Sequence, residues 1–336
     1  AWESAVDMYP KLSYKVVRFC GDLYYEKMSK AEAKSKIFVK LPAGKKVENQ
    51  RDIDCFMRDN LNVKLPMDGP LIRQYVQEYN PTDQAHLPAD QRNGGIVITK
   101  YHHGLCDGVS FVCMVLALGK EYSRDFFIKS KDARWYEELF VKLTWLIHLP
   151  KLLLTTVFAP TDDNFITRRK DQMNGELSIR TSKSFDLRQL KALSKNIEVS
   201  INDIVTAAIT TAFQQIFKEA GDPAKEINLV LPASVRFKFY PTRESLKLEN
   251  KFAAMALRLP LTESMEAAYP KIQKVTAAIR GGLPYLYASY SVAHWFNKLM
   301  PNCFMTKFVD DLTEKFTVSF SNTPGPIKPF VFDVKP

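Results

Sequence analysis

The stretch Tyr101-His102-His103-Gly104-Leu105-Cys106-Asp107-Gly108 decides how this sequence folds. The preceding residues 95–101 are apolar and rich in β-branched side chains, which is typical of a buried strand. The following residues 109–122 space their apolar side chains along one helical face. We therefore predict two adjacent histidines where a strand ends and an Asp-Gly turn leads into a helix.

Histidines at such a junction are candidates for acid–base chemistry. Strand ends in mixed sheets are where α/β proteins tend to place ligand sites. A neutral imidazole held there can remove a proton from an alcohol or a thiol. With five His and 13 Gly in 336 residues, this spacing arises by chance in roughly one of several thousand such chains. The alternative interpretation is structural: two histidines satisfied by backbone groups, beside an ordinary Asp-Gly turn.

The pattern His-His-x-x-x-Asp-Gly resembles the active-site signature of a known superfamily. Its members include chloramphenicol acetyltransferase, peptide-synthetase condensation domains and the wax ester synthase/diacylglycerol acyltransferases. The resemblance implies that His103, next to His102, is the general base. It also implies that Asp107 is mainly structural and pairs with an arginine, and that Gly108 lets the chain turn into the helix at little steric cost.

Further segments resemble the wax ester synthase/diacylglycerol acyltransferase branch in particular. They occur in the expected order from about residue 8 to residue 333, so the resemblance covers nearly the whole chain. The segments are Pro66 to Tyr75, Asn202-Asp203-Ile204-Val205, Pro232-Ala233-Ser234-Val235-Arg236, Asn250 and Ser321-Asn322-Thr323-Pro324-Gly325-Pro326. Two departures stand out: Ile72 replaces a tryptophan of the family pattern, and Glu249 replaces a glycine.

From these segments we predict a two-lobed α/β protein with the chloramphenicol acetyltransferase-like fold. Mixed sheets flanked by helices would enclose a central channel. An N-terminal lobe (1–123) would carry the motif, a hydrophobic crossover segment (124–175) would follow, and a C-terminal lobe (176–336) would complete the fold. We expect a polar loop at residues 80–93. Strands are predicted at 14–19, 72–76, 95–101, 177–180, 227–231, 253–260 and 316–320, and helices at 51–61, 109–122, 187–193, 204–216, 263–280 and 283–310.

Two further residues can support the motif. Arg236 can form a bidentate pair with Asp107 and lock the turn that orients His103, or it can be a surface arginine at a strand end. Asn202 can cap a helix start, or its amide can hold a substrate or an oxyanion.

The last motif has two interpretations as well. Ser319, Ser321 and Asn322 close a strand in a Pro-Gly turn. The turn resembles the family segment that forms the wall of the central channel. The resemblance implies that these side chains would contact the substrate or the oxyanion there. Its sequence alone also fits a simple turn.

The crossover segment contains an unusually apolar run at 135–159. A membrane-spanning helix needs about 20 mostly apolar residues, but Lys142, His148, Pro150 and Lys151 interrupt this run. We expect a kinked helical pair that lies at a membrane interface or over an acyl channel. A helix that bridges the lobes and a true membrane span are the alternatives.

Composition excludes several other classes of protein. The five cysteines are scattered, with no Cys-x-x-Cys pair, which argues against a disulfide scaffold and against zinc. Cys106 lies in the motif, where it is either a cysteine nucleophile or the occupant of a variable motif position. The net charge of +10 comes without any nucleic-acid-binding motif. It suits anionic lipid headgroups or the phosphates of coenzyme A, or it is simply a solvated basic surface.

The resemblance implies an O-acyltransferase. It would move a fatty acyl group from acyl-coenzyme A to a lipid alcohol, either a long-chain alcohol or diacylglycerol, with acyl-coenzyme A as substrate and no cofactor or metal. One alternative is a catalytically silent, acyltransferase-like structural subunit of a larger assembly, for example one in a membrane. Another is a condensation-type enzyme that uses carrier-bound acyl groups.

The family pattern also sets expectations about the ends and the surroundings of the chain. The family has a strand and a helix before the position of Ala1 and further strands after residues 321–326. We expect either missing ends, partner chains that supply them, or a reduced domain. We also expect peripheral membrane contact at the endoplasmic reticulum or a lipid droplet, with mitochondria as the alternative, and no nucleic-acid partner.

Overall fold

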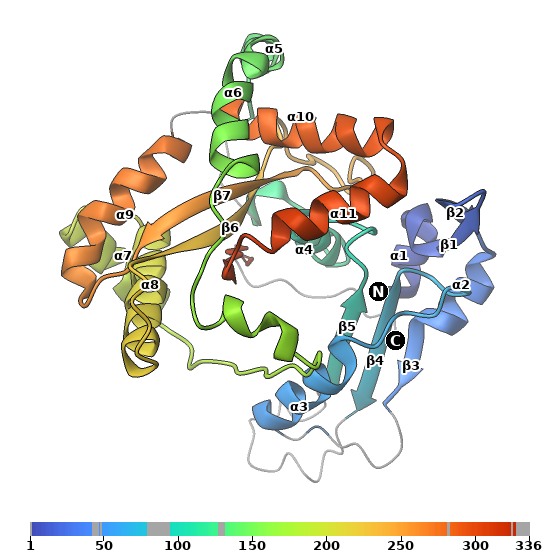
Figure 1. The fold of residues 1–336 in the computed structure, drawn as a ribbon. Helices are drawn as coiled ribbons and strands as arrows, with labels where there is room; N and C mark the ends of the chain where they lie inside the picture. Colours follow the sequence, from blue (N-terminus) through green and yellow to red (C-terminus); the bar gives the residue numbers. More distant parts are fainter. Residues whose placement is uncertain are drawn as a thin grey trace.

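The computed structural model describes residues 2–41, 47, 49–78, 95–126, 132–280, 283–323, 325 and 326. It is a mixed α/β structure in two lobes, each built on a three-stranded sheet (Figure 1). This confirms the predicted fold class. The expected polar loop at 80–93 and Pro324 of the last motif lie outside the described residues.

The first lobe contains the helices and strands that lead up to and away from the motif. Its sheet has the order β3-β4-β5, with β3 parallel to β4 and β4 antiparallel to β5. Its elements are α1 (Trp2–Met8), η1 (Pro10–Ser13), β1 (Tyr14–Phe19), β2 (Asp22–Lys27), α2 (Lys30–Ile37), β3 (Phe38–Lys40), α3 (Gln50–Leu61), β4 (Ile72–Glu78), β5 (Gly95–Tyr101), α4 (Gly108–Ala117) and η4 (Arg124–Phe126).

Most sequence-based expectations for this lobe are confirmed. The predicted strand at 14–19 is β1, and it pairs with β2 in a hairpin around Gly21, whose φ of +88° places it in the left-handed region. The predicted helix at 109–122 is too long, because Leu118 and Gly119 donate to carbonyls three residues back and end α4 in a tight turn. Helix α1 has no counterpart among the expected elements.

The crossover segment is a run of short helices with different periodicities. It consists of α5 (Trp135–Thr144), the 3₁₀ helix η5 (Trp145–His148), α6 (Leu149–Leu152) and the π-helix η6 (Leu153–Val157). The segment is thus helical, as expected, but it is one run of four stretches rather than a pair. Its expected place at a membrane interface or over an acyl channel stays a prediction. The segment packs on α10 and leaves α5 projecting from the top of the molecule (Figure 1).

The second lobe carries a sheet in the order β7-β6-β8. Strands β6 and β7 are antiparallel, and β8 runs parallel to β6. The elements are η7 (Thr167–Gln172), α7 (Leu187–Asn196), α8 (Ile201–Glu219), β6 (Glu226–Ser234), β7 (Phe252–Pro260), α9 (Met265–Arg280), α10 (Leu283–Leu299), α11 (Asn302–Thr313) and β8 (Val318–Ser319).

Two predicted strands of this lobe need correction. Residues 177–180 are irregular, because the following Thr181 is held by its hydroxyl and amide on Asp54 of α3 rather than by a neighbouring strand. The last strand, expected at 316–320, is reduced to Val318–Ser319. Backbone bonds from Thr317 and Phe320 to β6 still keep its flanks extended.

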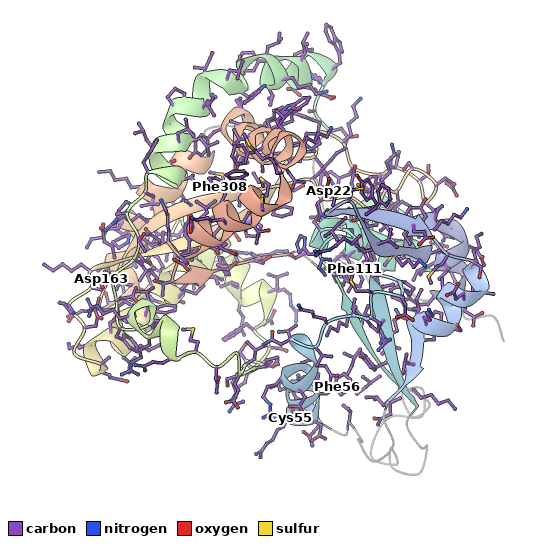
Figure 2. The ribbon with its side chains drawn as sticks, turned by 45° about the vertical axis from the view of Figure 1, so that its right-hand side comes forward. Asp22, Cys55, Phe56, Phe111, Asp163 and Phe308 are labelled. Carbon is purple, nitrogen blue, oxygen red and sulfur yellow. The ribbon has the colours of Figure 1, made fainter. Side chains whose placement is uncertain are left out.

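The two lobes have separate hydrophobic cores, and one segment of the chain crosses from the second lobe into the core of the first. In Figure 2, Phe56 and Phe111 mark the first lobe, and Asp163 and Phe308 mark the second. Phe111 stacks on Tyr101 at the end of β5, with ring centres 4.3 Å apart. The first core also takes in residues from a segment that lies between β6 and β7 in sequence: Phe239, Tyr240, Leu246 and Leu248. The lobes therefore interlock through residues 239–248, although the three-part division of the chain remains a prediction.

Candidate active site

The motif forms the loop between β5 and α4, and backbone hydrogen bonds fix its first histidine. The amide of His102 donates to the carbonyl of Leu71 at 2.8 Å. The amide of Gly104 donates to Nδ1 of His102 at 3.0 Å. Because Nδ1 accepts that bond, the proton of the neutral His102 ring lies on Nε2. His102 therefore shapes the loop in a single tautomer.

His103 presents an exposed imidazole. Its ring lies edge-on to Phe252 at the start of β7, with ring centres 5.3 Å apart. Its backbone carbonyl accepts a hydrogen bond from Nδ2 of Asn250 at 2.8 Å. Within the described part of the chain, neither ring nitrogen of His103 has a hydrogen-bond partner. The ring can therefore exchange a proton with a bound molecule.

Asp107 is buried and serves as the N-cap of α4. Its carboxylate accepts from the amide of Ser110 at 2.9 Å and from the amide of Lys251 at 2.8 Å. Nη2 of Arg236 lies 2.9 and 2.8 Å from its two oxygens. The predicted pair is thus present, and a single guanidinium nitrogen contacts both carboxylate oxygens. The alternative interpretation of Arg236 as a surface arginine is wrong, because its side chain is buried.

The guanidinium of Arg236 is satisfied by more than Asp107. Nη2 donates to Oγ of Ser110 at 2.7 Å and Nη1 to the carbonyl of Lys251 at 3.3 Å. A buried ion pair is tolerated when the remaining donors and acceptors also have partners. The network therefore clamps the N-terminus of α4 to the chain on either side of residues 239–248.

Two residues that the sequence did not single out support the motif loop from beneath. Nζ of Lys11 donates to the carbonyls of Gly104 at 3.1 Å, Leu105 at 2.6 Å and Leu248 at 3.1 Å. The hydroxyl of Tyr25 also donates to Gly104, at 2.8 Å. Burial lowers the pKa of Lys11. No sequence signal marked these residues, because they lie about eighty to ninety positions before the motif.

Gly108 has a different role from the expected one. It is the first residue of α4 and does not lie in the left-handed region that favours glycine. A Cβ there would lie 3.3 Å from Oγ1 of Thr323. The glycine is therefore explained by the close approach of residue 323 rather than by backbone freedom.

Asn202 and Asn322, two of the expected substrate-binding residues, are brought together. Nδ2 of Asn322 donates to Oδ1 of Asn202 at 2.5 Å. Asn202 does not cap α8, because Oγ of Ser200 accepts the bond from Asp203 and acts as the cap. The residues around 322 and 323 therefore link the start of α8 to the start of α4.

The remaining expected binding residues are Ser319 and Ser321. Both are exposed, Ser319 within β8 and Ser321 just after it. Neither side chain has a hydrogen bond within the described residues. Their assignment to a channel wall stays a prediction.

Cys106 is poorly suited to act as a nucleophile. Its side chain is fully buried, and burial raises its pKa to about 12. The reactive form of cysteine is the thiolate, which is therefore scarce near neutral pH. Among the residues that the structure describes, no group of three or more His, Cys, Asp or Glu side chains could hold a metal ion.

Two lobes with mixed sheets and a His-His-x-x-x-Asp-Gly loop between strand and helix define the chloramphenicol acetyltransferase-like fold class. Residues 248–336 match the family model for the WS/DGAT C-terminal domain. This confirms the resemblance to the wax ester synthase/diacylglycerol acyltransferases. The matched domain begins at the segment that accepts hydrogen bonds from Lys11 and from the Asp107 backbone.

Solved structures share the fold at low sequence identity. The wax ester synthase/diacylglycerol acyltransferase from Marinobacter aquaeolei VT8 is 15% identical, with a TM-score of 0.51 over 98% of this chain and 73% of that one. The SgcC5 protein from Streptomyces globisporus is 12% identical, with a TM-score of 0.50 over 97% of this chain and 71% of that one. No curated protein sequence matches the chain.

Proposed function

We propose that this protein is an acyl-coenzyme A-dependent O-acyltransferase that esterifies a lipid alcohol, either a long-chain alcohol or diacylglycerol. The match to the WS/DGAT C-terminal domain supports an acyltransferase that acts on lipids. The observation that carries the proposal is the exposed His103 ring, whose nitrogens have no hydrogen-bond partner within the described residues. It sits on a loop that Asp107 and Arg236 hold from behind.

The proposed reaction is a direct transfer. His103 takes the proton of the acceptor hydroxyl while the hydroxyl oxygen attacks the thioester carbonyl. The new C–O bond forms, the C–S bond breaks, and the imidazolium returns the proton to the departing thiolate of coenzyme A. General-base assistance of this kind contributes about 10²–10⁴-fold to the rate, and positioning of the two substrates contributes much of the remainder.

The oxyanion needs a hydrogen-bond donor, and Asn202 is the candidate. Its Oδ1 is occupied by Asn322, which leaves its Nδ2 group turned the other way. Within the described residues, that amide nitrogen has no partner, and the side chain is exposed. We assign Asn202 the role of oxyanion donor, with Asn322 fixing the orientation of its amide.

The crossover segment supports peripheral membrane contact. Residues Trp135–Thr156 form the one described helical run that is long and apolar enough to cross a membrane, and only 11% of the most apolar window is buried. Changes of helical periodicity and the lysines Lys142 and Lys151 interrupt it. We therefore propose that it lies in the membrane interface, at the endoplasmic reticulum or a lipid droplet, rather than spanning the bilayer.

The test is release of coenzyme A from palmitoyl-coenzyme A, with hexadecanol or dioleoylglycerol as acceptor. His103→Ala should abolish acceptor-dependent release without changing the melting temperature. His148→Ala is the matched control, because His148 packs on Tyr285, away from the motif, and should retain activity. Full activity in His103→Ala would refute the mechanism.

The second candidate is a silent, acyltransferase-like subunit of a larger assembly. Exposed apolar side chains on α10, on α11 and in the turn between them favour it, namely Trp295, Leu299, Met300, Phe304 and Val309. Absence of release from a folded wild-type protein with every acyl-coenzyme A tested would favour this candidate. Purification of the endogenous protein with stable partner chains would support it further.

A further inference from the structure

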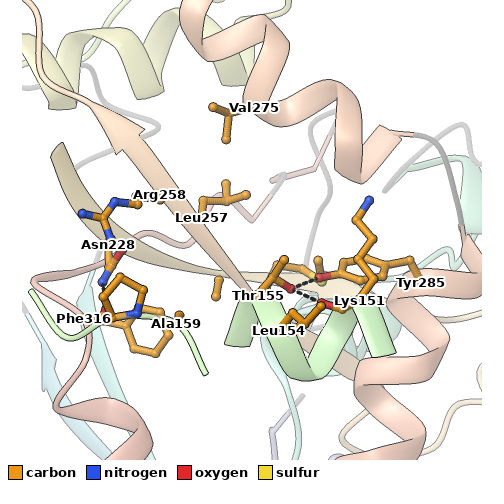
Figure 3. Close-up of a pocket in the computed structure, with 13 residues that line it drawn as sticks. Lys151, Leu154, Thr155, Ala159, Asn228, Leu257, Arg258, Val275, Tyr285 and Phe316 are labelled. Atoms are coloured by element: carbon orange, nitrogen blue, oxygen red, sulfur yellow. Dashed lines mark hydrogen bonds between the residues drawn. The ribbon is translucent and has the colours of Figure 1, made fainter. Parts of the chain in front are cut away.

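A cavity of about 370 Å³ lies along β7 (Figure 3). The crossover segment, α9 and α10 contribute its walls. Most lining side chains are apolar, including Leu154, Ala159, Met255, Leu257, Val275 and Phe316. None of the lining residues belongs to the motif loop or to the Asp107–Arg236 pair.

The polar groups in the wall are nearly all satisfied within the protein. Oγ1 of Thr155 and the hydroxyl of Tyr285 lie 2.7 Å apart. The amide of Asn228 donates to the carbonyls of Pro160 at 2.8 Å and Lys315 at 3.0 Å. These groups therefore offer little to a polar ligand, and the cavity favours an apolar chain.

The two cations that line the cavity differ in their partners. Arg258 is neutralised by Glu226, with Nε 2.6 Å from the carboxylate. Nζ of Lys151 lies over the ring of Tyr285, 5.2 Å from its centre. Lys151 has no acidic partner among the described residues. In Figure 3 the two cations lie at opposite sides of the cavity, so the unneutralised positive charge is at the Lys151 side.

We propose that this cavity binds a single-chain anionic lipid, with the chain along β7 and the carboxylate or phosphate head at Lys151. The volume lies near the lower end of the range for small-molecule pockets, about 300–1,000 Å³, which suits one acyl chain better than two. Leu154 at the wall is 66% exposed, and the nearby Phe158 is 70% exposed. An amphiphile can therefore enter from the apolar outer surface of the crossover segment.

The test measures binding in a His103→Ala background, where the proposed reaction cannot consume ligand. The fluorescent fatty acid cis-parinarate reports occupancy, and myristate competes with it. Each further methylene buried should strengthen competition by up to about fourfold. Laurate should therefore compete more weakly than myristate. Because turnover plays no part, failure of the proposed enzyme activity would not affect the outcome.

Charge and shape are tested separately. Lys151→Met should weaken the binding of myristate at least tenfold while leaving the affinity for neutral tetradecanol unchanged. Lys298→Met is the matched control, because its ammonium lies 5.3 Å from the Trp295 ring centre in the same kind of contact but away from the cavity. Val275→Trp should fill the cavity and weaken both ligands, with the melting temperature preserved.

The head group is identified by comparing myristate with 1-myristoyl-lysophosphatidate. Competition by either anion that is lost in Lys151→Met and in Val275→Trp supports the site, and the stronger competitor identifies the head. Unchanged myristate binding in both folded variants would overturn the proposal. So would tetradecanol binding as tightly as both anions.

Discussion

Nη2 of Arg236 lies 2.8 and 2.9 Å from the two carboxylate oxygens of Asp107, and 129 positions of sequence separate the two residues. The pair joins the end of β6 to the N-terminus of α4. Both side chains are buried, so neither charge is screened by water. The orientation of the motif loop therefore depends on a contact between the lobes.

Arg236→Met should strongly destabilise the protein. It leaves the Asp107 carboxylate buried without its counter-ion, which costs about 3–5 kcal/mol of unfolding free energy. Urea unfolding monitored by circular dichroism measures this loss. Arg258→Met is the control, because its pair with Glu226 is exposed and should contribute only about 0–1 kcal/mol. Equal losses in the two variants would contradict this account of the buried pair.

Gly108→Ala should be harmful even though alanine is normally the better helix former. The added methyl would lie 3.3 Å from Oγ1 of Thr323 and push that residue away. Because Thr323 is exposed and can shift, we expect a cost of about 1 kcal/mol, the lower end of the range for overpacking in a core, and the displaced segment includes Asn322 beside Asn202. Thr323→Ala should rescue Gly108→Ala in both stability and transfer rate. A double-mutant cycle with purely additive effects would show that the two positions do not interact.

Lys11→Met should disturb the motif loop, although Lys11 lies far from the motif in the sequence. Three carbonyls, those of Gly104, Leu105 and Leu248, lose a charged donor. Hydrogen bonds to charged groups contribute about 1.5–3 kcal/mol each, so the variant should unfold at clearly lower urea concentration. Lys15→Met is the control, since that lysine pairs with Glu26 on the exposed hairpin. A Lys11→Met protein as stable as Lys15→Met would be inconsistent with a supporting role.

The two buried thiols should make the unfolding free energy depend on pH in the alkaline range. Burial raises the pKa of Cys106 and of Cys113 from 9.0 to about 12. Between these values the folded protein binds more protons than the unfolded chain. The contribution of each thiol to the unfolding free energy is therefore fully present below pH 9 and is lost as the pH rises toward 12. For each thiol the loss is up to about 1.4 kcal/mol per pH unit. The pKa values of Tyr9, Tyr101 and Tyr240 are also raised, from 10.0 to about 12, so the thiol contribution is best measured between pH 9 and 10.

Alanine at Cys106 and Cys113 should flatten this pH dependence. In a parallel measurement, iodoacetamide at pH 8 should label the exposed Cys20 and Cys303 while sparing both buried thiols. Rapid labelling of Cys106 in the folded protein would restore the hypothesis of a cysteine nucleophile.

Local patterns in the sequence predicted the strand, turn and helix around the motif, because these depend on neighbouring residues. The pairing of Arg236 with Asp107 came from the family resemblance. The roles of Lys11 and Tyr25, and the packing of residues 239–248 in the first core, depend on contacts between distant parts of the chain. Nothing in the local sequence encodes such contacts. Gly108 shows the same limit: the sequence marks the glycine, but only the position of Thr323 explains it.

The crossover segment should hold the protein on anionic membranes through its exposed apolar residues. Leu143 and Ile147 are 68% and 75% exposed. Burial of such a side chain contributes about 1.5–3 kcal/mol, so Leu143→Glu/Ile147→Glu should weaken binding to phosphatidylserine vesicles by at least about two orders of magnitude. Co-sedimentation measures this affinity. The control is Leu187→Glu/Leu193→Glu on α7, where the side chains are 55% and 42% exposed. Equal loss in both double variants would indicate a general charge effect, and no sedimentation of the wild-type protein would remove the membrane from the proposed function.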